Sequence, residues 1–160
     1  MINIKTYIKN SLYKKNHLTE FVDLQKSNEI AIFAKKIDPE YIEGAIVINY
    51  YEEILGLGYW DYIVPTWQFW IDAIDEYLIK NHSIVNFPDQ PAKIILKRIY
   101  NDILGIKIDN SDRKIEIKEF DFFNSMLDSA VYFFKEIEKY FSVSTGIYLV
   151  KAYELKAKIQ

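Results

Sequence analysis

The spacing of apolar residues along the chain alternates between the period of a strand and that of a helix. Residues 45–51 are rich in β-branched and aromatic side chains, with Ile46, Ile48 and Tyr50 on one face, as in a strand. In 114–119, apolar and polar residues alternate, as they do in a strand with one buried face. In 61–80 and 121–141, apolar residues recur every three or four positions, as they do on one face of a helix. The pattern therefore predicts strands combined with two long helices.

Shorter patterns predict the remaining elements. Short connections between the strands indicate antiparallel pairing. A helix is indicated at 18–24, and 81–91 is interpreted as a loop stiffened by Pro88 and Pro91. The predicted strands are a short edge strand at 3–8, one at 29–34, a hairpin of 45–51 and 54–57 that turns at Glu52 and Glu53, and a three-strand meander of 93–100, 103–108 and 114–119.

Each long helix is preceded by an aspartate, and Asp61 and Asp121 are predicted to be the N-caps. The tail at 146–159 fits both periods, but its content of Ala, Leu, Lys and Glu favours a helix. The fold class expected is α+β, with a hairpin and a three-strand meander forming an antiparallel sheet and two long helices packed on one of its faces. The predicted apolar stripes of the long helices are Ile63, Trp67, Trp70, Ile71, Ile74 and Leu78, and Phe123, Leu127, Ala130, Phe134, Ile137 and Phe141.

Composition narrows the class of protein. The chain has 160 residues, which fits a single domain over 1–160, and its apolar content of 50% excludes a disordered chain. There is no cysteine, which excludes disulfides, thiolate catalysis and Cys-ligated metal sites. Met1 to Asn10 contain no apolar run of signal-peptide length, and no apolar stretch is long enough to span a bilayer. We therefore expect a cytoplasmic protein.

Charge is distributed unevenly along the sequence. The window 37–79 holds nine acidic residues and no Lys, Arg or His, whereas the net charge of the whole chain is −3. The same window contains all three tryptophans. Acidic charge combined with aromatic residues is typical of a surface that meets a basic partner. The alternative is that the aromatics form the core and the acids are its solvated rim.

On the first interpretation, the partner-binding residues are the acids and aromatics of the hairpin, of the following strand-to-helix junction and of the polar face of the first long helix. Acidic groups would steer the encounter, and aromatic rings would supply the buried contact. The candidates are Glu52, Glu53, Tyr59, Trp60, Asp61, Tyr62, Asp72, Asp75 and Glu76.

Motifs for catalysis, metal binding and nucleotide binding are absent from the sequence. His17 and His82 lie in polar contexts without a second ligand at the spacing of a zinc site. Gly56 and Gly58 lack the third glycine of a dinucleotide fingerprint. The acids at 72–76 are spaced as on any amphipathic helix, so we expect a solvated face, with no metal, no cofactor and no enzymatic activity.

Nucleic-acid binding is also not expected. The basic residues are scattered along the sequence, as in Lys14–Lys15, Lys35–Lys36 and Lys97–Arg98, and the isoelectric point is about 5.5. No motif for nucleic-acid recognition is present.

A resemblance adds to this interpretation. A small, acidic, cysteine-free α+β chain with a hairpin, a Tyr59-Trp60-Asp61 junction, an aromatic and acidic helix and a Phe87–Pro91 loop resembles the immunity proteins of bacterial polymorphic and contact-dependent toxin systems. The resemblance is one of general character and is concentrated in 44–91. It implies a cytoplasmic protein that binds a toxin domain of nuclease type and covers its basic active site.

Two other functions remain open at this point. The chain could be a structural protein whose exposed aromatics close a homodimer. It could also be a small enzyme that uses carboxylates, although no nucleophile, metal set or cofactor loop supports that. A complex steered by charge should form more slowly as ionic strength rises, whereas a hydrophobic homodimer should hardly respond.

Overall fold

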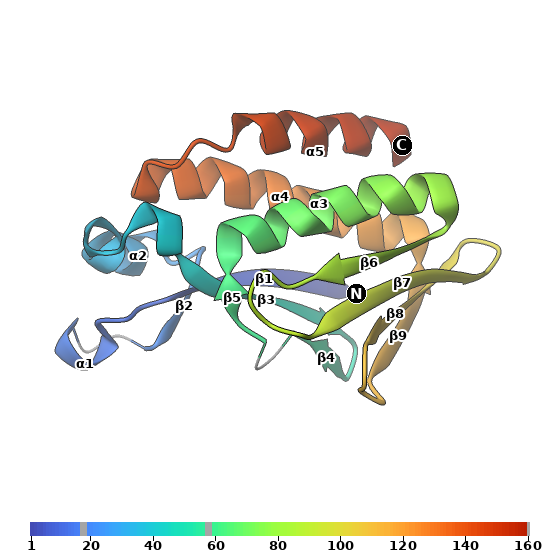
Figure 1. Cartoon of the computed structure of the whole chain (residues 1–160), viewed down its shortest axis with the longest axis horizontal. Coiled ribbons are helices and arrows are strands. Elements are labelled where there is room, and N and C mark those ends of the chain that lie inside the picture. Colours follow the sequence, from blue (N-terminus) through green and yellow to red (C-terminus); the bar gives the residue numbers. More distant parts are fainter. Residues whose placement is uncertain (17–18, 57–58, 160) are drawn as a thin grey trace.

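A computed structural model describes residues 1–16, 19–56 and 59–159, and it shows an α+β fold in which long helices lie over antiparallel sheets (Figure 1). The elements are β1 (Ile2–Lys9), α1 (Tyr13–Asn16), β2 (Phe21–Asp23), α2 (Ser27–Phe33), η1 (Ala34–Lys36), η2 (Pro39–Tyr41), β3 (Glu43–Tyr50), β4 (Glu53–Leu55), β5 (Asp61–Tyr62), α3 (Ile63–Lys80), β6 (His82–Asn86), β7 (Lys93–Tyr100), β8 (Ile103–Ile108), β9 (Lys114–Lys118), α4 (Glu119–Phe141) and α5 (Gly146–Ile159).

The first sheet has the order β2-β1-β3-β4, and β5 also pairs with β3. The predicted hairpin is confirmed, but it turns at Tyr51 and Glu52, where Tyr51 has a φ of 51°. The expected edge strand at 3–8 is instead an inner strand, because β1 pairs with β3 on one side and with β2 on the other.

Two short segments were predicted with the wrong period. Within 18–24, residues Phe21–Asp23 form strand β2 and not a helix, while Leu18 lies outside the described residues. The predicted strand at 29–34 is wrong, because it lies in helix α2 and the helical turn η1. Ile30 and Phe33 are buried one helical turn apart, whereas Ile32 is 55% exposed, so the alternation was coincidental.

The second sheet has the order β6-β7-β8-β9 and contains the three predicted strands of the meander. The fourth strand, β6, occupies 82–86, so the loop predicted at 81–91 is wrong over that part. β6 continues directly from helix α3 through Asn81, whose φ of 59° reverses the chain. The hairpin and the meander therefore belong to two sheets, where the sequence predicted one.

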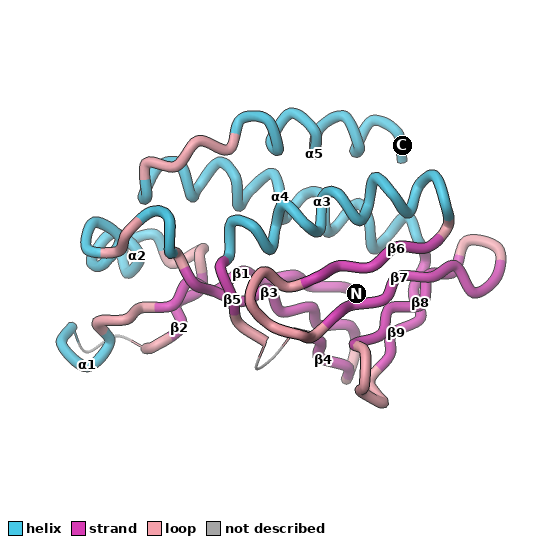
Figure 2. The backbone as a smooth tube through the Cα atoms, in the orientation of Figure 1, coloured by secondary structure: helices cyan, strands magenta, loops and turns pink. Residues whose placement is uncertain are grey.

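Both long helices are confirmed, and so is the helix at 146–159. Neither aspartate is a cap: α3 begins at Ile63 after Tyr62, α4 begins at Glu119 after Lys118, and neither preceding residue makes a side-chain capping bond. Figure 2 shows the long helices α3, α4 and α5 together on one side of the strands, while the short helix α1 lies apart from them.

The core lies between the helices and the sheets. Trp67 and Trp70 are buried, and the Trp67 ring stacks on Phe133 at 5.7 Å between ring centroids. The Trp67 indole N–H donates to Thr6 Oγ1 at 3.2 Å and so links α3 to β1. The predicted stripes are buried in both long helices, apart from Leu78, which is half-buried. Among the described residues, no helix combines the length and the apolarity needed to cross a membrane.

Candidate functional site: a groove on the first sheet

The outer face of the first sheet carries an apolar groove of about 440 Å³. Alternation along β3 sends Ile46 and Ile48 into the core beneath the helices and leaves Ala45 and Val47 on the opposite face. These two small side chains form the floor of the groove, because larger neighbours on both sides rise above them. The lining residues are Tyr7, Phe21, Ala45, Val47, Asn49, Ile54, Gly56 and Trp60.

One wall of the groove depends on a glycine. Gly56 follows β4 with a φ of 89°, a conformation that L side chains rarely adopt. A Cβ atom at this position would lie 2.0 Å from the carbonyl oxygen of Ile46. Only glycine therefore allows the chain to pass this close to β3 before it reaches Trp60.

Trp60 is the large aromatic residue at the rim. It is 38% exposed, and its ring centroid lies 6.5 Å from that of Phe21. The Lys9 ammonium sits 3.8 Å from the indole centroid, within the range of a cation–π contact. Lys9 also pairs with Glu43 at 3.3 Å, so the charges at this end of the groove compensate each other.

Asp61 positions the tryptophan and does not cap a helix. Its carboxylate is 5% exposed and accepts the backbone N–H groups of Asp89 at 2.8 Å and Gln90 at 3.1 Å. The Gln90 side-chain amide donates to the Trp60 carbonyl oxygen. Asp61 thus ties the loop after β6 to the strand-to-helix junction. Sequence patterns did not predict this role, because the bonded residue Asp89 lies 28 positions away.

The other predicted residues of the junction lie beside the same loop. Tyr59 packs on Phe87 with ring centroids 6.0 Å apart, and Tyr62 meets Tyr41 edge-on at 6.0 Å. The structure therefore brings together the four consecutive candidates at 59–62. Glu52 and Glu53 are exposed on the hairpin that supplies Ile54 to the groove.

The acidic face of α3 lies elsewhere and is already paired. Asp72 and Asp75 accept Lys151 of α5 at 2.8 and 3.2 Å, and Asp75 also faces Lys158 at 3.5 Å. Burial acts to lower the pKa of Lys151, but its hydrogen bonds to the two aspartates outweigh that effect and raise it.

The third acid of this face, Glu76, pairs with Lys80 of the same helix at 2.8 Å. The hydrogen bond from Lys80 lowers the pKa of the Glu76 carboxyl. All three candidates belong to α3, in the layer of long helices, and Asp72 and Asp75 contact α5 (Figure 1).

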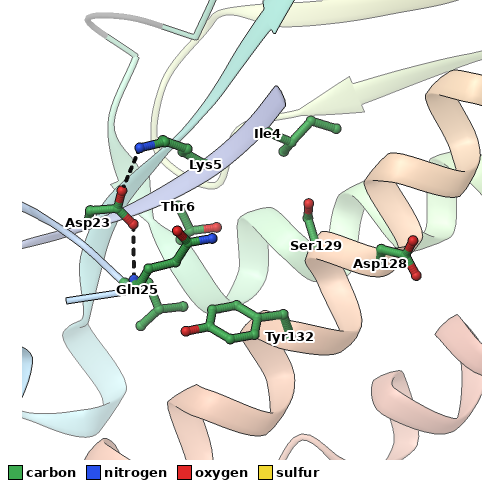
Figure 3. A pocket seen from close by; sticks show the side chains of 9 residues that line it. Ile4, Lys5, Thr6, Asp23, Gln25, Asp128, Ser129 and Tyr132 are labelled. Atoms are coloured by element: carbon green, nitrogen blue, oxygen red, sulfur yellow. Dashed lines mark hydrogen bonds and ion pairs between the residues drawn. The ribbon is translucent and has the colours of Figure 1, made fainter. Parts of the chain in front are cut away.

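A second, smaller hollow of about 210 Å³ opens between β1, β2 and α4 (Figure 3). Ser129 and Tyr132 of α4 line it together with Thr6 of β1 and Asp23 of β2, and the Lys5 side chain turns to Asp23. Asp23 accepts both Lys5 Nζ at 2.9 Å and the Gln25 backbone N–H at 3.0 Å, so its carboxylate is occupied. Burial raises the pKa of the Tyr132 phenol. Sequence reasoning missed this hollow, because it joins residues from distant segments.

A metal site would require a group of ligating side chains among the described residues. Within the described part of the chain, no three His, Cys, Asp or Glu side chains are grouped to hold a metal ion. His82 is exposed at the start of β6, with Nδ1 3.2 Å from the Lys80 carbonyl oxygen, and His17 lies outside the described residues. A partner bound in the groove would therefore be held by burial of apolar surface.

Comparisons with known protein families, with curated proteins and with solved structures found no match for this chain. Structure and sequence alone define its class, an α+β chain with an apolar groove bordered by aromatic rings.

Proposed function

We propose that this chain is a binding protein that neutralises a basic protein partner, namely a bacterial toxin domain of nuclease type, and that it docks through the groove of the first sheet. The observation that carries the proposal is Trp60, a partly exposed tryptophan at the rim of an apolar groove. Tryptophans in such positions are enriched among the residues that dominate binding energy at interfaces.

The rigidity of the site supports the same function. The junction at 59–62 is tied by Asp61 to the loop at 89–90, and Lys9 covers part of the Trp60 ring. A preorganised aromatic anchor loses little conformational entropy when it binds.

Electrostatic steering in this proposal comes from the hairpin and not from α3. Glu52 and Glu53 are exposed and make no ion pair within the described residues, whereas Asp72, Asp75 and Glu76 are paired with lysines of the same chain. A basic partner could approach the hairpin without displacing an internal contact. Rim charges of this kind act mainly on the association rate.

The homodimer is the second candidate, and the same groove favours it, because an exposed apolar surface can equally be covered by a second copy. Light scattering across a range of protein concentrations separates the two functions. A dimer that Trp60→Ala dissociates would support the homodimer. A monomer at all concentrations would support docking of a different protein.

The test uses the purified product of the adjacent gene, because immunity proteins are encoded beside their toxins. Calorimetry should give a complex of equal stoichiometry, and Trp60→Ala should weaken it by at least about 2 kcal/mol. The matched control is Tyr153→Ala on α5, since Tyr153 is also exposed and lies beneath a lysine, Lys135. A complex that is equally tight with Trp60→Ala would contradict the proposed site.

Electrostatic steering is tested separately in the same complex. Glu53→Lys should slow association and reduce its dependence on salt, while Glu154→Lys, an equal charge change on α5, should not. Loss of toxin inhibition in the Trp60 variant, measured as cell growth during toxin expression, would link binding to neutralisation.

A further inference from the structure

The outer face of the second sheet gathers lysines that are far apart in the sequence. Antiparallel alternation sends Val85, Leu96 and Ile106 into the core and leaves the intervening positions in solvent. We call the exposed surface the lysine face; it consists of His82, Ile84, Asn86, Lys93, Ile95, Lys97, Ile99, Tyr100, Ile103, Lys107, Lys114, Glu116 and Lys118.

The positive charge of this face is almost uncompensated. Only one of the five lysines, Lys114, has an ion pair among the described residues, with Glu116 at 3.2 Å. Lys107 and Lys114 are direct cross-strand neighbours, an arrangement of like charges that costs stability in a sheet. An anionic partner would relieve this repulsion.

The apolar positions indicate which kind of anion fits. Ile84 and Ile99 are 46% and 47% exposed, and Ile95 and Ile103 are half-buried beside the lysines. Phosphates of a nucleic-acid backbone would leave these isoleucines without a partner. Tyr100, which pairs with Ile103 and is 57% exposed, gives this face one aromatic ring, whereas a bound single strand stacks successive bases on several rings. A protein surface, in contrast, can offer carboxylates and aliphatic side chains together.

One end of the lysine face is hollowed. A depression of about 510 Å³ at the β6 edge is lined by Ile84, Ile95 and Lys97, among others. Ser83 lines it as well; this residue is 3% exposed, and its hydroxyl has no hydrogen-bond partner in the described part of the chain. The Ser83 side chain points to the core together with that of its cross-strand partner Leu96, so a carboxylate that entered here would meet Lys97 beside Ile84 and Ile95.

We propose that the lysine face is a second docking surface, which binds an acidic protein partner whose contact surface combines carboxylates with aliphatic side chains. This partner differs in charge from the one assigned to the groove. The inference rests on the lysine face alone and holds whether or not the groove binds a toxin.

The test measures fluorescence anisotropy at low ionic strength with three labelled probes. They are a peptide of alternating glutamate and valine, a polyglutamate peptide of equal length and a short DNA duplex. The alternating peptide should bind most tightly, because it alone supplies both kinds of contact. Lys97→Glu with Lys107→Glu should weaken its binding about tenfold or more.

The matched control is Lys35→Glu with Lys36→Glu, an equal charge change on η1, which lies at the other end of the molecule from the second sheet (Figure 1). It should leave peptide affinity within about twofold of wild type. Ile84→Ser should weaken the alternating peptide and leave polyglutamate unchanged. If the charge reversal unfolds the protein, Lys97→Gln with Lys107→Gln replaces it.

Three results would overturn the proposal. Equal affinity of the lysine-face variant and wild type would make the face an ordinary solvated surface. Tighter binding of the duplex than of either peptide would assign the face to nucleic acid. If neither peptide binds, the proposal of an acidic partner is wrong.

Discussion

The outer faces of the two sheets are both formed by alternate residues of antiparallel strands, but they expose different side chains. On the first sheet, Ala45 and Val47 lie beneath Trp60, and the nearby Lys9 is paired with Glu43. On the second sheet, short connections join β7 to β8 and β8 to β9, and four of the five lysines lack an ion pair within the described residues. The difference lies in the connections: the segment that leaves β4 at Gly56 returns beside β3, and it contributes a wall to the groove. Strand pattern alone does not determine what a sheet face can bind.

The largest effect that would test this comparison is on stability. Gly56→Val should lower the free energy of unfolding by about 3 kcal/mol, because it adds a clash with the Ile46 carbonyl to an unfavourable φ. On the second sheet, Gly105→Ala should cost no more than about 1 kcal/mol, since the close contacts of its Cβ, at 2.8 and 3.0 Å, are with the Ile99 side chain, and the Lys97 carbonyl oxygen lies at an ordinary 3.4 Å. Urea unfolding of both variants measures the difference. Equal costs would mean that the wall of the groove does not depend on Gly56.

A smaller effect tests how the second sheet is attached to the helices. The Glu119 carboxylate accepts the Tyr77 hydroxyl at 2.5 Å and the Arg98 guanidinium through both of its oxygens. Burial acts to raise the pKa of Glu119, but the hydrogen bonds from Arg98 and Tyr77 outweigh it and lower that pKa. Glu119→Gln should therefore lower the free energy of unfolding by about 2 kcal/mol at neutral pH.

The pH dependence of this cluster has a defined sign. Because the folded pKa of Glu119 is lower than the unfolded value of about 4.3, its contribution is present above that pH and is lost as pH falls through the folded pKa. The difference between wild type and Glu119→Gln should thus shrink below about pH 4. Denaturant unfolding across that range measures it, and a difference independent of pH would show that the carboxylate charge is not what stabilises the cluster.

The smallest effect concerns the acids of α3. Asp72→Asn with Asp75→Asn removes ion pairs to Lys151 and Lys158 that are partly exposed to solvent. The loss of stability should be below about 1 kcal/mol and should decrease further with added salt. If the same variant slowed binding of the partner more than Glu53→Lys did, the docking surface would include α3 and not the groove alone.

The long periodic segments were predictable from sequence because burial of one face imposes its period on many residues. Residues 61–80 and 121–141 repeat the helical spacing over several turns, and 114–119 repeats the strand spacing. Short segments were not predictable in this way. The residues of α2 satisfy both periods, and β6 is a strand only because β7 offers it a partner.

The candidate site was predicted in part. Trp60 and its neighbours at 59–62 do lie together beside the groove, but Phe21 and Tyr7 come from strands whose pairing the sequence did not predict. The negative charge of the acidic window is also partly balanced in the folded protein. Lysines outside the window pair with Glu43, Asp72, Asp75 and Glu76.

By itself, the sequence determined the α+β class, the long helices, the buried Trp67 and Trp70, and the strands of the meander, because these follow from the local period of apolar residues. Only the tertiary structure decided that the strands form two sheets, that Asp61 fastens a loop, and which charges remain unpaired. Hydrogen bonds and ion pairs of this kind join residues far apart in the chain. Their partners are chosen by packing, which local spacing does not encode.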